Sequence, residues 1–158
     1  MTKAEMIQQI MAVLESENPE QVNQYLTPDF MLKGPFPGPL GREQFLEYIK
    51  ALKRAFPDWA YHFIFIREED GDSIRGVIQR QGTHQGDFSL PGMVTVPATG
   101  ISVILPIEPI RFFFQGEMLT RLEIEDASGG GLEGILEQLG AELPRRLDGL
   151  FERQYETA

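Results

Sequence analysis

The sequence of 158 residues contains no cysteine, and this absence excludes several kinds of chemistry. Without thiols the chain can form neither disulfides nor thiolate nucleophiles, and it cannot hold zinc or an iron–sulfur centre through sulfur ligands. Histidine is almost as scarce, since only His62 and His84 could offer an imidazole to a metal. Because no spaced cluster of carboxylates accompanies these two residues, we expect no bound metal and no cofactor.

Basic residues are also few. Fourteen lysines and arginines stand against 24 aspartates and glutamates, which gives a net charge of -10. Such a chain would be repelled by a nucleic-acid backbone or an anionic membrane surface, so we expect neither as a partner. No run of about 18 consecutive apolar residues occurs, and we therefore expect no membrane span and no signal peptide. The resulting expectation is a soluble, cytoplasmic protein.

The composition that remains is ordinary for a globular chain, with 42% hydrophobic and 24% charged residues. Its length suits one folded domain. We expect a single domain over 1–158, with a core at 4–127 and C-terminal helices within 132–154. The sequence Ser-Gly-Gly-Gly at 128–131 is a flexible break between these two parts.

Three helices are predicted before the long strands. Apolar residues recur at helical spacing over 4–16 and again from Phe45 to Phe56, where Pro57 prevents continuation. Between these segments, the sequence Asn-Pro-Glu at 18–20 is typical of a helix start. It predicts a short helix that ends near Leu26.

From Trp59 to the turn at Glu68 the apolar spacing changes to two, which predicts a strand. Further strands are predicted over 73–84, 101–114 and 118–125. The segment 87–100 lacks periodicity, and we expect it to form a movable cover over the open end of a pocket. Helices followed by long antiparallel strands are typical of an α+β fold, in which the third helix lies in the curve of the sheet and leaves a cavity beside it.

Several short motifs, taken in their order and spacing, resemble one known family. They are Gly41-Arg42-Glu43 at the start of the third helix, Phe56-Pro57-Asp58-Trp59 at its end, Gly82-Thr83-His84-Gln85-Gly86, and Pro97-Ala98-Thr99-Gly100. The sequence Ile-Leu-Glu-Gln-Leu-Gly at 135–140 fits the same pattern. Over roughly residues 5 to 140 the chain resembles the SnoaL-like polyketide cyclases and ester cyclases of the nuclear transport factor 2-like superfamily.

The resemblance implies a cystatin-like fold, in which a cone-shaped, curved antiparallel sheet wraps around the N-terminal helices. It also implies a cavity that holds a small hydrophobic molecule, which we expect to carry a carbonyl group. Since one fold can support many activities, the reaction does not follow from the fold. A cofactor-independent cyclase, isomerase or lyase that uses a carboxylate base is one hypothesis. A non-catalytic binding protein or a dimeric structural module is the alternative.

In the cyclases that the chain resembles, the base is an aspartate that follows a histidine by two residues on the last strand. Glu123 and Arg121 occupy these two places here. The catalytic hypothesis makes Glu123 the base, with Arg121 or His84 as the group that polarises a carbonyl. The same alternation also fits a strand whose polar side faces solvent or a partner subunit, so both interpretations stay open.

The predicted ligand-binding residues are aromatic side chains and polar side chains in apolar surroundings. Glu108 lies in an apolar run, and a buried carboxylate is costly without a partner, so either it is buried and pairs with Arg80 or Arg111, or a bulge turns it outward. The full predicted set is Trp59, Tyr61, Tyr48, Arg80, Glu108 and Phe112. Apolar residues on both faces of the long strands further predict a homodimer that forms through the outer face of the sheet.

Overall fold

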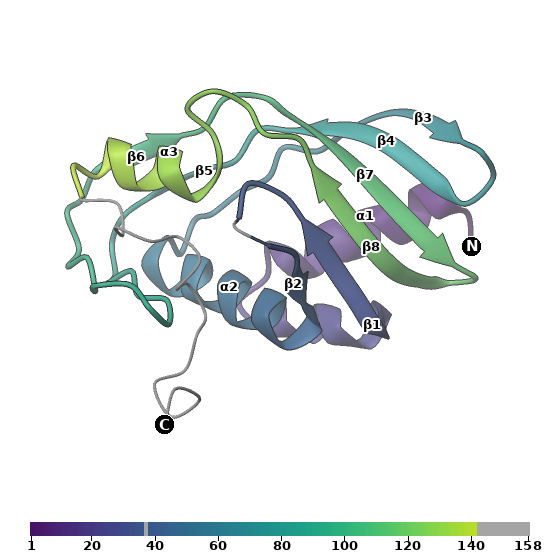
Figure 1. The fold of residues 1–158 in the computed structure, drawn as a ribbon, viewed down its shortest axis with the longest axis horizontal. Coiled ribbons are helices and arrows are strands. Elements are labelled where there is room, and N and C mark those ends of the chain that lie inside the picture. Colours follow the sequence, from purple (N-terminus) through teal and green to yellow (C-terminus); the bar gives the residue numbers. More distant parts are fainter. Residues whose placement is uncertain (37, 142–158) are drawn as a thin grey trace.

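The computed structural model describes residues 1–36 and 38–141. Three helical segments come early in the chain: α1 (Lys3–Leu14), the 3-10 helix η1 (Pro19–Tyr25) and α2 (Arg42–Ala55). A curved, mostly antiparallel sheet lies above them, and the helices cover one of its faces (Figure 1). The predicted α+β fold, with N-terminal helices against a curved sheet, is confirmed.

The main sheet has the strand order β2-β1-β8-β7-β4-β3. Its strands are β1 (Leu26–Lys33), β2 (Leu40–Gly41), β3 (Ile64–Glu69), β4 (Ser73–Ile78), β7 (Glu108–Gln115) and β8 (Met118–Ile124). Neighbouring strands are antiparallel except β1 and β8, which run parallel. A separate antiparallel pair is formed by β5 (Gln81–Thr83) and β6 (Ser102–Ile104), and α3 (Gly131–Gln138) lies beside β6 (Figure 1).

Local signals explain where α2 begins and ends. The Gln44 side chain accepts a hydrogen bond from the Gly41 N–H at 3.0 Å, which satisfies a backbone donor at the helix start. Lys53 and Arg54 lie in the last turn, where positive charge is favourable, and Pro57 follows soon after. The buried face of the helix consists of Phe45, Tyr48, Ile49, Ala51, Leu52 and Ala55.

Three predicted strands differ from the observed ones. β3 begins at Ile64 instead of Trp59, because His62 has a left-handed backbone with φ of 46° that interrupts the alternation. The predicted strand 101–114 is divided into β6 and β7 around Pro106, which has no N–H to donate to a ladder. The predicted strand 73–84 is likewise divided, into β4 and β5.

The C-terminal part follows the predicted glycine-rich break. α3 confirms the first of the two C-terminal helices that the sequence predicts. The second, around Leu147 to Phe151, lies outside the described residues. Within the part of the chain that is described, no helix is long and apolar enough to cross a membrane.

The hydrophobic core lies between the helices and the inner face of the sheet. Its largest fully buried side chains are Phe30, Phe56, Phe88, Phe112, Ile7, Ile10, Leu26, Leu32, Leu52, Ile74, Ile78 and Leu105. Because α1 and α2 both contribute to this core, they pack against the same face of the sheet. Within residues 1–36 and 38–141, no helix covers the outer face (Figure 1).

Candidate functional site

A small internal cavity lies between the sheet and the first helices. Its volume is about 30 Å³, which exceeds the roughly 10–15 Å³ that one water molecule needs. Typical ligand pockets are larger, at about 300–1,000 Å³. The lining residues are Met11, Leu14, Leu32, Phe45, Tyr48, Ile49, Tyr61, Ile78, Arg80, Ile110, Phe112, Leu122 and Ile124. Among the described residues, the polar part of this wall is therefore limited to Tyr48, Tyr61 and Arg80.

A buried ion pair forms the polar end of the cavity. Arg80 is 3% exposed and Glu108 is 0% exposed. The Nε and Nη2 atoms of Arg80 each donate a hydrogen bond of 3.1 Å to one oxygen of the Glu108 carboxylate. Two parallel charge-assisted hydrogen bonds fix both position and orientation. Glu108 is thus buried and paired. Its partner is Arg80, one of the two arginines that the sequence suggested.

Two more elements, α2 and α3, form hydrogen bonds with this pair. The Tyr48 hydroxyl of α2 accepts a hydrogen bond of 3.2 Å from Arg80 Nη1. The Gly131 N–H at the start of α3 donates to Glu108 Oε2, also at 3.2 Å. Because the Tyr48 oxygen already accepts, its hydroxyl hydrogen is left to donate, and no acceptor for it is found within 1–36 and 38–141.

Burial controls the protonation of these groups. It raises the pKa of Tyr48, although the nearby Arg80 acts in the opposite direction. Burial is also the largest cause of a raised pKa for Tyr61. For Arg80, burial alone would lower the pKa, but the interactions with Tyr48 and Glu108 outweigh it and raise the pKa. At neutral pH the cavity therefore presents two protonated hydroxyls and a charged guanidinium.

The structure gathers five of the six predicted ligand-binding residues around this cavity. Four line it directly: Tyr48, Tyr61, Arg80 and Phe112. Glu108 lies behind the wall, bonded to Arg80. Trp59 is not part of the wall, and its ring instead packs against Phe56 with the ring centroids 4.9 Å apart.

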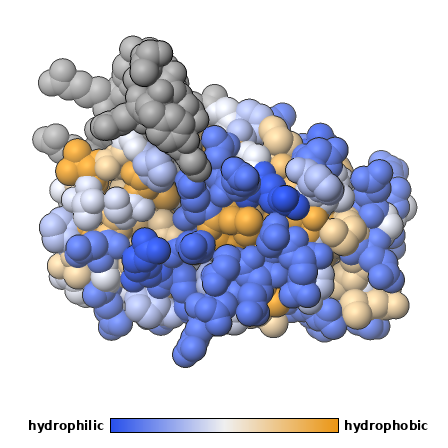
Figure 2. Space-filling model, turned by 90° about the horizontal axis from the view of Figure 1, so that it is seen from below, coloured by the Kyte–Doolittle hydropathy of each residue, from blue (hydrophilic) through white to orange (hydrophobic). Residues whose placement is uncertain are grey.

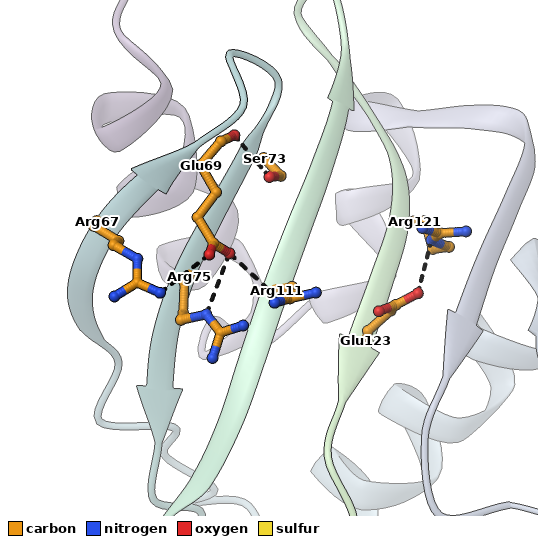
Figure 3. A network of polar contacts seen from close by, with 7 residues as sticks. All are labelled: Arg67, Glu69, Ser73, Arg75, Arg111, Arg121 and Glu123. Carbon is orange, nitrogen blue, oxygen red and sulfur yellow. Dashed lines mark hydrogen bonds and ion pairs between the residues drawn. The ribbon is translucent and has the colours of Figure 1, made fainter.

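The three predicted catalytic residues do not meet at the cavity. Leu122 and Ile124 of β8 line it, so the alternation of the strand directs Arg121 and Glu123 to the outer face. There Arg121 Nε lies 3.1 Å from a Glu123 oxygen, and the two side chains are 47% and 25% exposed (Figure 3). The expectation that this pair faces the cavity is wrong. Burying the apolar side chains of Leu122 and Ile124 is favourable, whereas burying two charges is costly.

His84, the third predicted catalytic residue, is buried at a different place. Its Nδ1 accepts a hydrogen bond of 3.2 Å from the Thr99 N–H and lies 2.9 Å from the Thr99 hydroxyl. The ring packs against Phe56, and burial lowers the His84 pKa, which favours the neutral imidazole. His84 is not a lining residue of the cavity. Its contacts instead join the two ends of the loop that follows β5.

The segment 87–100 does not cover this cavity either. Phe88 and Leu90 are buried in the core, and Phe88 pairs with Val96 in an isolated bridge. No residue of the segment contributes to the cavity wall. The prediction that the segment 87–100 covers the pocket is therefore wrong, because the segment lies elsewhere.

The outer face of the sheet carries a second polar network, centred on Glu69 (Figure 3). The Glu69 carboxylate lies 3.2 Å from both Arg67 and Arg75, and 3.4 Å from Arg111. The hydrogen bond from Arg75 is the largest cause of a lowered pKa for Glu69. Among the residues described, no group of three or more His, Asp or Glu side chains is arranged to hold a metal ion.

Other parts of the wall were not singled out from the sequence. Met11, Leu14, Phe45 and Ile49 complete it from the helices. Their only signal was helical apolar spacing, which ordinary core residues show as well. The contact from Gly131 to Glu108 left no sequence signal, because a backbone N–H depends only on where the chain passes.

Comparisons with known proteins agree with this geometry at the level of the fold. The family model described as SnoaL-like polyketide cyclase matches residues 4–104. No curated protein matches the chain. Among solved structures, AclR from Streptomyces galilaeus, a candidate hydroxylase, is 17% identical with a TM-score of 0.67, and the alignment covers 87% of this chain and 94% of AclR.

Two other solved structures illustrate the range of similar proteins. A candidate SnoaL-like polyketide cyclase from Jannaschia sp. CCS1 is 16% identical with a TM-score of 0.67, over 89% of this chain and 92% of the other. A phenazine biosynthesis-related protein from Pseudomonas aeruginosa is 12% identical with a TM-score of 0.61, over 96% and 90%. Likeness at such identities supports a common fold and leaves the reaction open.

Proposed function

The chain belongs to the SnoaL-like polyketide cyclase family, and from this premise we propose that its internal cavity binds a small hydrophobic molecule that carries a carbonyl oxygen. The observation that carries the proposal is the placement of three hydrogen-bond donors, Tyr48, Tyr61 and Arg80, in an otherwise apolar wall. Apolar walls with a few convergent polar groups are typical of small-molecule sites. The ligand oxygen would accept the hydrogen bond that Tyr48 has left to donate.

The same donors suit a reaction that passes through an enolate. When a proton leaves the carbon beside a carbonyl group, negative charge develops on the oxygen, and fixed donors in a water-poor site stabilise it. Arg80 is held in place by Glu108 and reaches Tyr48 through Nη1, so the donors are oriented before a ligand arrives. A cofactor-independent cyclisation, isomerisation or elimination is the reaction class that we propose.

A non-catalytic binding protein is the second candidate, and one observation favours it. Among the described residues, no carboxylate or imidazole lines the cavity. Glu108 is the carboxylate nearest to it, but its oxygens already accept from Arg80 and from Gly131. Proton abstraction would thus need a base that the ligand or a rearranged wall supplies.

A ligand of ordinary size also requires the wall to move, because about 30 Å³ holds only water. Met11 and Leu14 of α1 close one side of the cavity. Methionine is unbranched and adapts its shape easily, so Met11 is the side chain most able to make room. We propose that the ligand enters by displacing the α1 side of the wall.

Replacing Tyr48 with Phe tests the proposed binding role. The variant keeps the ring and loses the hydroxyl, so we expect acetophenone to bind about 5- to 10-fold more weakly, which corresponds to about one hydrogen bond. Ethylbenzene, which has nearly the same shape without the oxygen, should bind both proteins equally. Isothermal titration calorimetry measures the affinity of each ligand for both proteins.

Tyr25→Phe is the matched control, because Tyr25 is a partly buried tyrosine that does not line the cavity. It should leave the affinity for acetophenone unchanged. Equal affinity of wild type and Tyr48→Phe for acetophenone would show that the hydroxyl does not bind the carbonyl oxygen. A similar loss in the Tyr25 variant would lead to the same conclusion.

We further propose that two copies associate through the outer face of the sheet. Ile64 of the edge strand β3 is 63% exposed and lies next to Val77, its partner in the ladder. The helical side of the molecule is largely hydrophilic, with only limited hydrophobic areas showing between hydrophilic residues (Figure 2). Apolar side chains on the outer face would be removed from water in a dimer.

Light scattering at micromolar concentration should therefore report a dimer for the wild type. Ile64→Lys places a charge in the proposed interface and is expected to raise the dimer dissociation constant at least about tenfold. Val94→Lys is the control, since Val94 is 85% exposed and belongs to the segment 87–100, outside the strands of the main sheet. A wild-type monomer, or equal effects of the two substitutions, would contradict this mode of association.

A further inference from the structure

The charges at the cavity are balanced. Arg80 supplies one positive charge and Glu108 one negative charge, and both side chains are almost completely buried. The rest of the described wall is apolar or hydroxyl-bearing. A ligand that enters therefore meets an ion pair whose charges balance, and the described part of the wall offers it no unpaired charge.

A charged ligand would be unfavourable beside this pair. Three of the five N–H groups of Arg80 already donate to Glu108 and Tyr48, so a ligand carboxylate could reach only the other two, close to the negative charge of Glu108. If it did not displace Glu108, it would be buried without a counter-ion, and an unpaired buried charge costs much free energy. A ligand ammonium would lie near the Arg80 guanidinium, while the Glu108 oxygens are already occupied.

An uncharged ligand meets no such penalty. The hydroxyls of Tyr48 and Tyr61 stay protonated, because burial raises the pKa of each. Such hydroxyls donate to an oxygen that bears no charge, for example that of a ketone. The wall is thus suited to a hydrogen-bond acceptor without net charge.

We propose that Glu108 is a specificity-determining residue: by neutralising Arg80 it excludes anionic ligands from the cavity and admits uncharged oxygen acceptors. The inference rests on the proposed function, since it requires that a ligand occupies the cavity. It goes further because it assigns the selection to one residue that does not itself line the wall.

Three probes of similar size test the selectivity of the wild-type protein. Acetophenone is an uncharged ketone, benzoate is an anion and benzylamine is a cation at neutral pH. We expect calorimetry to show that acetophenone binds at least about tenfold more tightly than either ion. Equal affinities for acetophenone and benzoate would overturn the inference and leave the proposed binding function standing. Absence of binding by all three would instead overturn the proposed function.

Glu108→Gln tests the assigned residue. The substitution nearly preserves the shape and leaves Arg80 without its counter-ion, so benzoate should gain at least about tenfold in affinity relative to acetophenone. Benzoate should also raise the melting temperature of this variant more than that of the wild type, because it replaces the missing charge. A variant that keeps the wild-type preference would overturn the role of Glu108.

Glu123→Gln is the matched control. It removes a carboxylate that is also paired with an arginine, Arg121, but on the outer face of the sheet. The change in net charge is the same, so a general electrostatic effect would act in both variants. We expect the preference of Glu123→Gln to equal that of the wild type, and a matching shift in both variants would overturn the inference. If Glu108→Gln does not fold, the comparison of the three probes on the wild type still tests whether the cavity prefers uncharged ligands.

Discussion

Replacing Arg80 with Met is expected to lower the free energy of unfolding by about 3–5 kcal/mol, the usual cost of breaking a buried ion pair from one side. The carboxylate of Glu108 is fully buried and would lose two of its three hydrogen bonds, keeping the one from the Gly131 N–H. Tyr48 would lose its bond from Nη1 as well. Urea denaturation followed by circular dichroism measures the change.

The double variant Arg80→Met/Glu108→Gln shows whether the cost comes from the unpaired charge. It removes both charges and leaves a side-chain oxygen to accept from Gly131, so it should be more stable than Arg80→Met alone by about 2 kcal/mol or more. Arg121→Met removes the arginine of an exposed pair and should cost less than about 1 kcal/mol. If Arg80→Met costs no more than Arg121→Met, the buried pair does not hold the structure together as the geometry indicates.

Gly86→Ala is expected to destabilise the protein by about 2–3 kcal/mol, in the upper part of the usual range for overpacking. A Cβ at this position would overlap the carbonyl oxygen of Arg54 at the end of α2. Backbone atoms cannot swing aside as a side chain can. The N–H groups of Gln85 and Gly86 both donate to the Ala55 carbonyl, at 2.9 and 3.0 Å, so a shift of the loop would break these bonds.

Gly38→Ala is the control, because nothing lies within 4 Å of a Cβ built there. We expect it to change the free energy of unfolding by no more than about 0.5 kcal/mol, as is usual for surface substitutions. Thermal melts of both variants, compared with the wild type, give the difference. Equal stability of the two variants would mean that the loop after β5 does not pack closely against the end of α2.

Elements with strong local signals were predictable from the sequence. The limits of α2 follow from apolar residues at helical spacing and from Pro57, both of which act within the helix itself. The start of β3 was harder to predict, because no local pattern indicated the left-handed backbone of His62. The parallel pairing of β1 with β8 joins residues about 90 positions apart, and no local pattern encodes it.

The candidate site was predictable only in part, for a related reason. Alternation showed that Arg121 and Glu123 share one face of β8, but alternation alone does not say which face is buried. The cost of a buried charge predicted a partner for Glu108, but it did not decide between Arg80, which is the partner, and Arg111. The hydrogen bond from Arg80 to Tyr48 could not be predicted from local patterns, because α2 and the end of β4 meet only in the folded chain.

The most direct test of the proposed site is a crystal structure of the protein soaked with acetophenone. We expect the ring between α1 and the inner face of the sheet, with the ketone oxygen about 2.7–3.2 Å from the Tyr48 hydroxyl and the Arg80–Glu108 pair intact. Met11 should have moved away from its position in the empty protein. A ligand bound on the outer face beside Arg121 and Glu123, with the internal cavity still closed, would contradict the assignment of this cavity as the functional site.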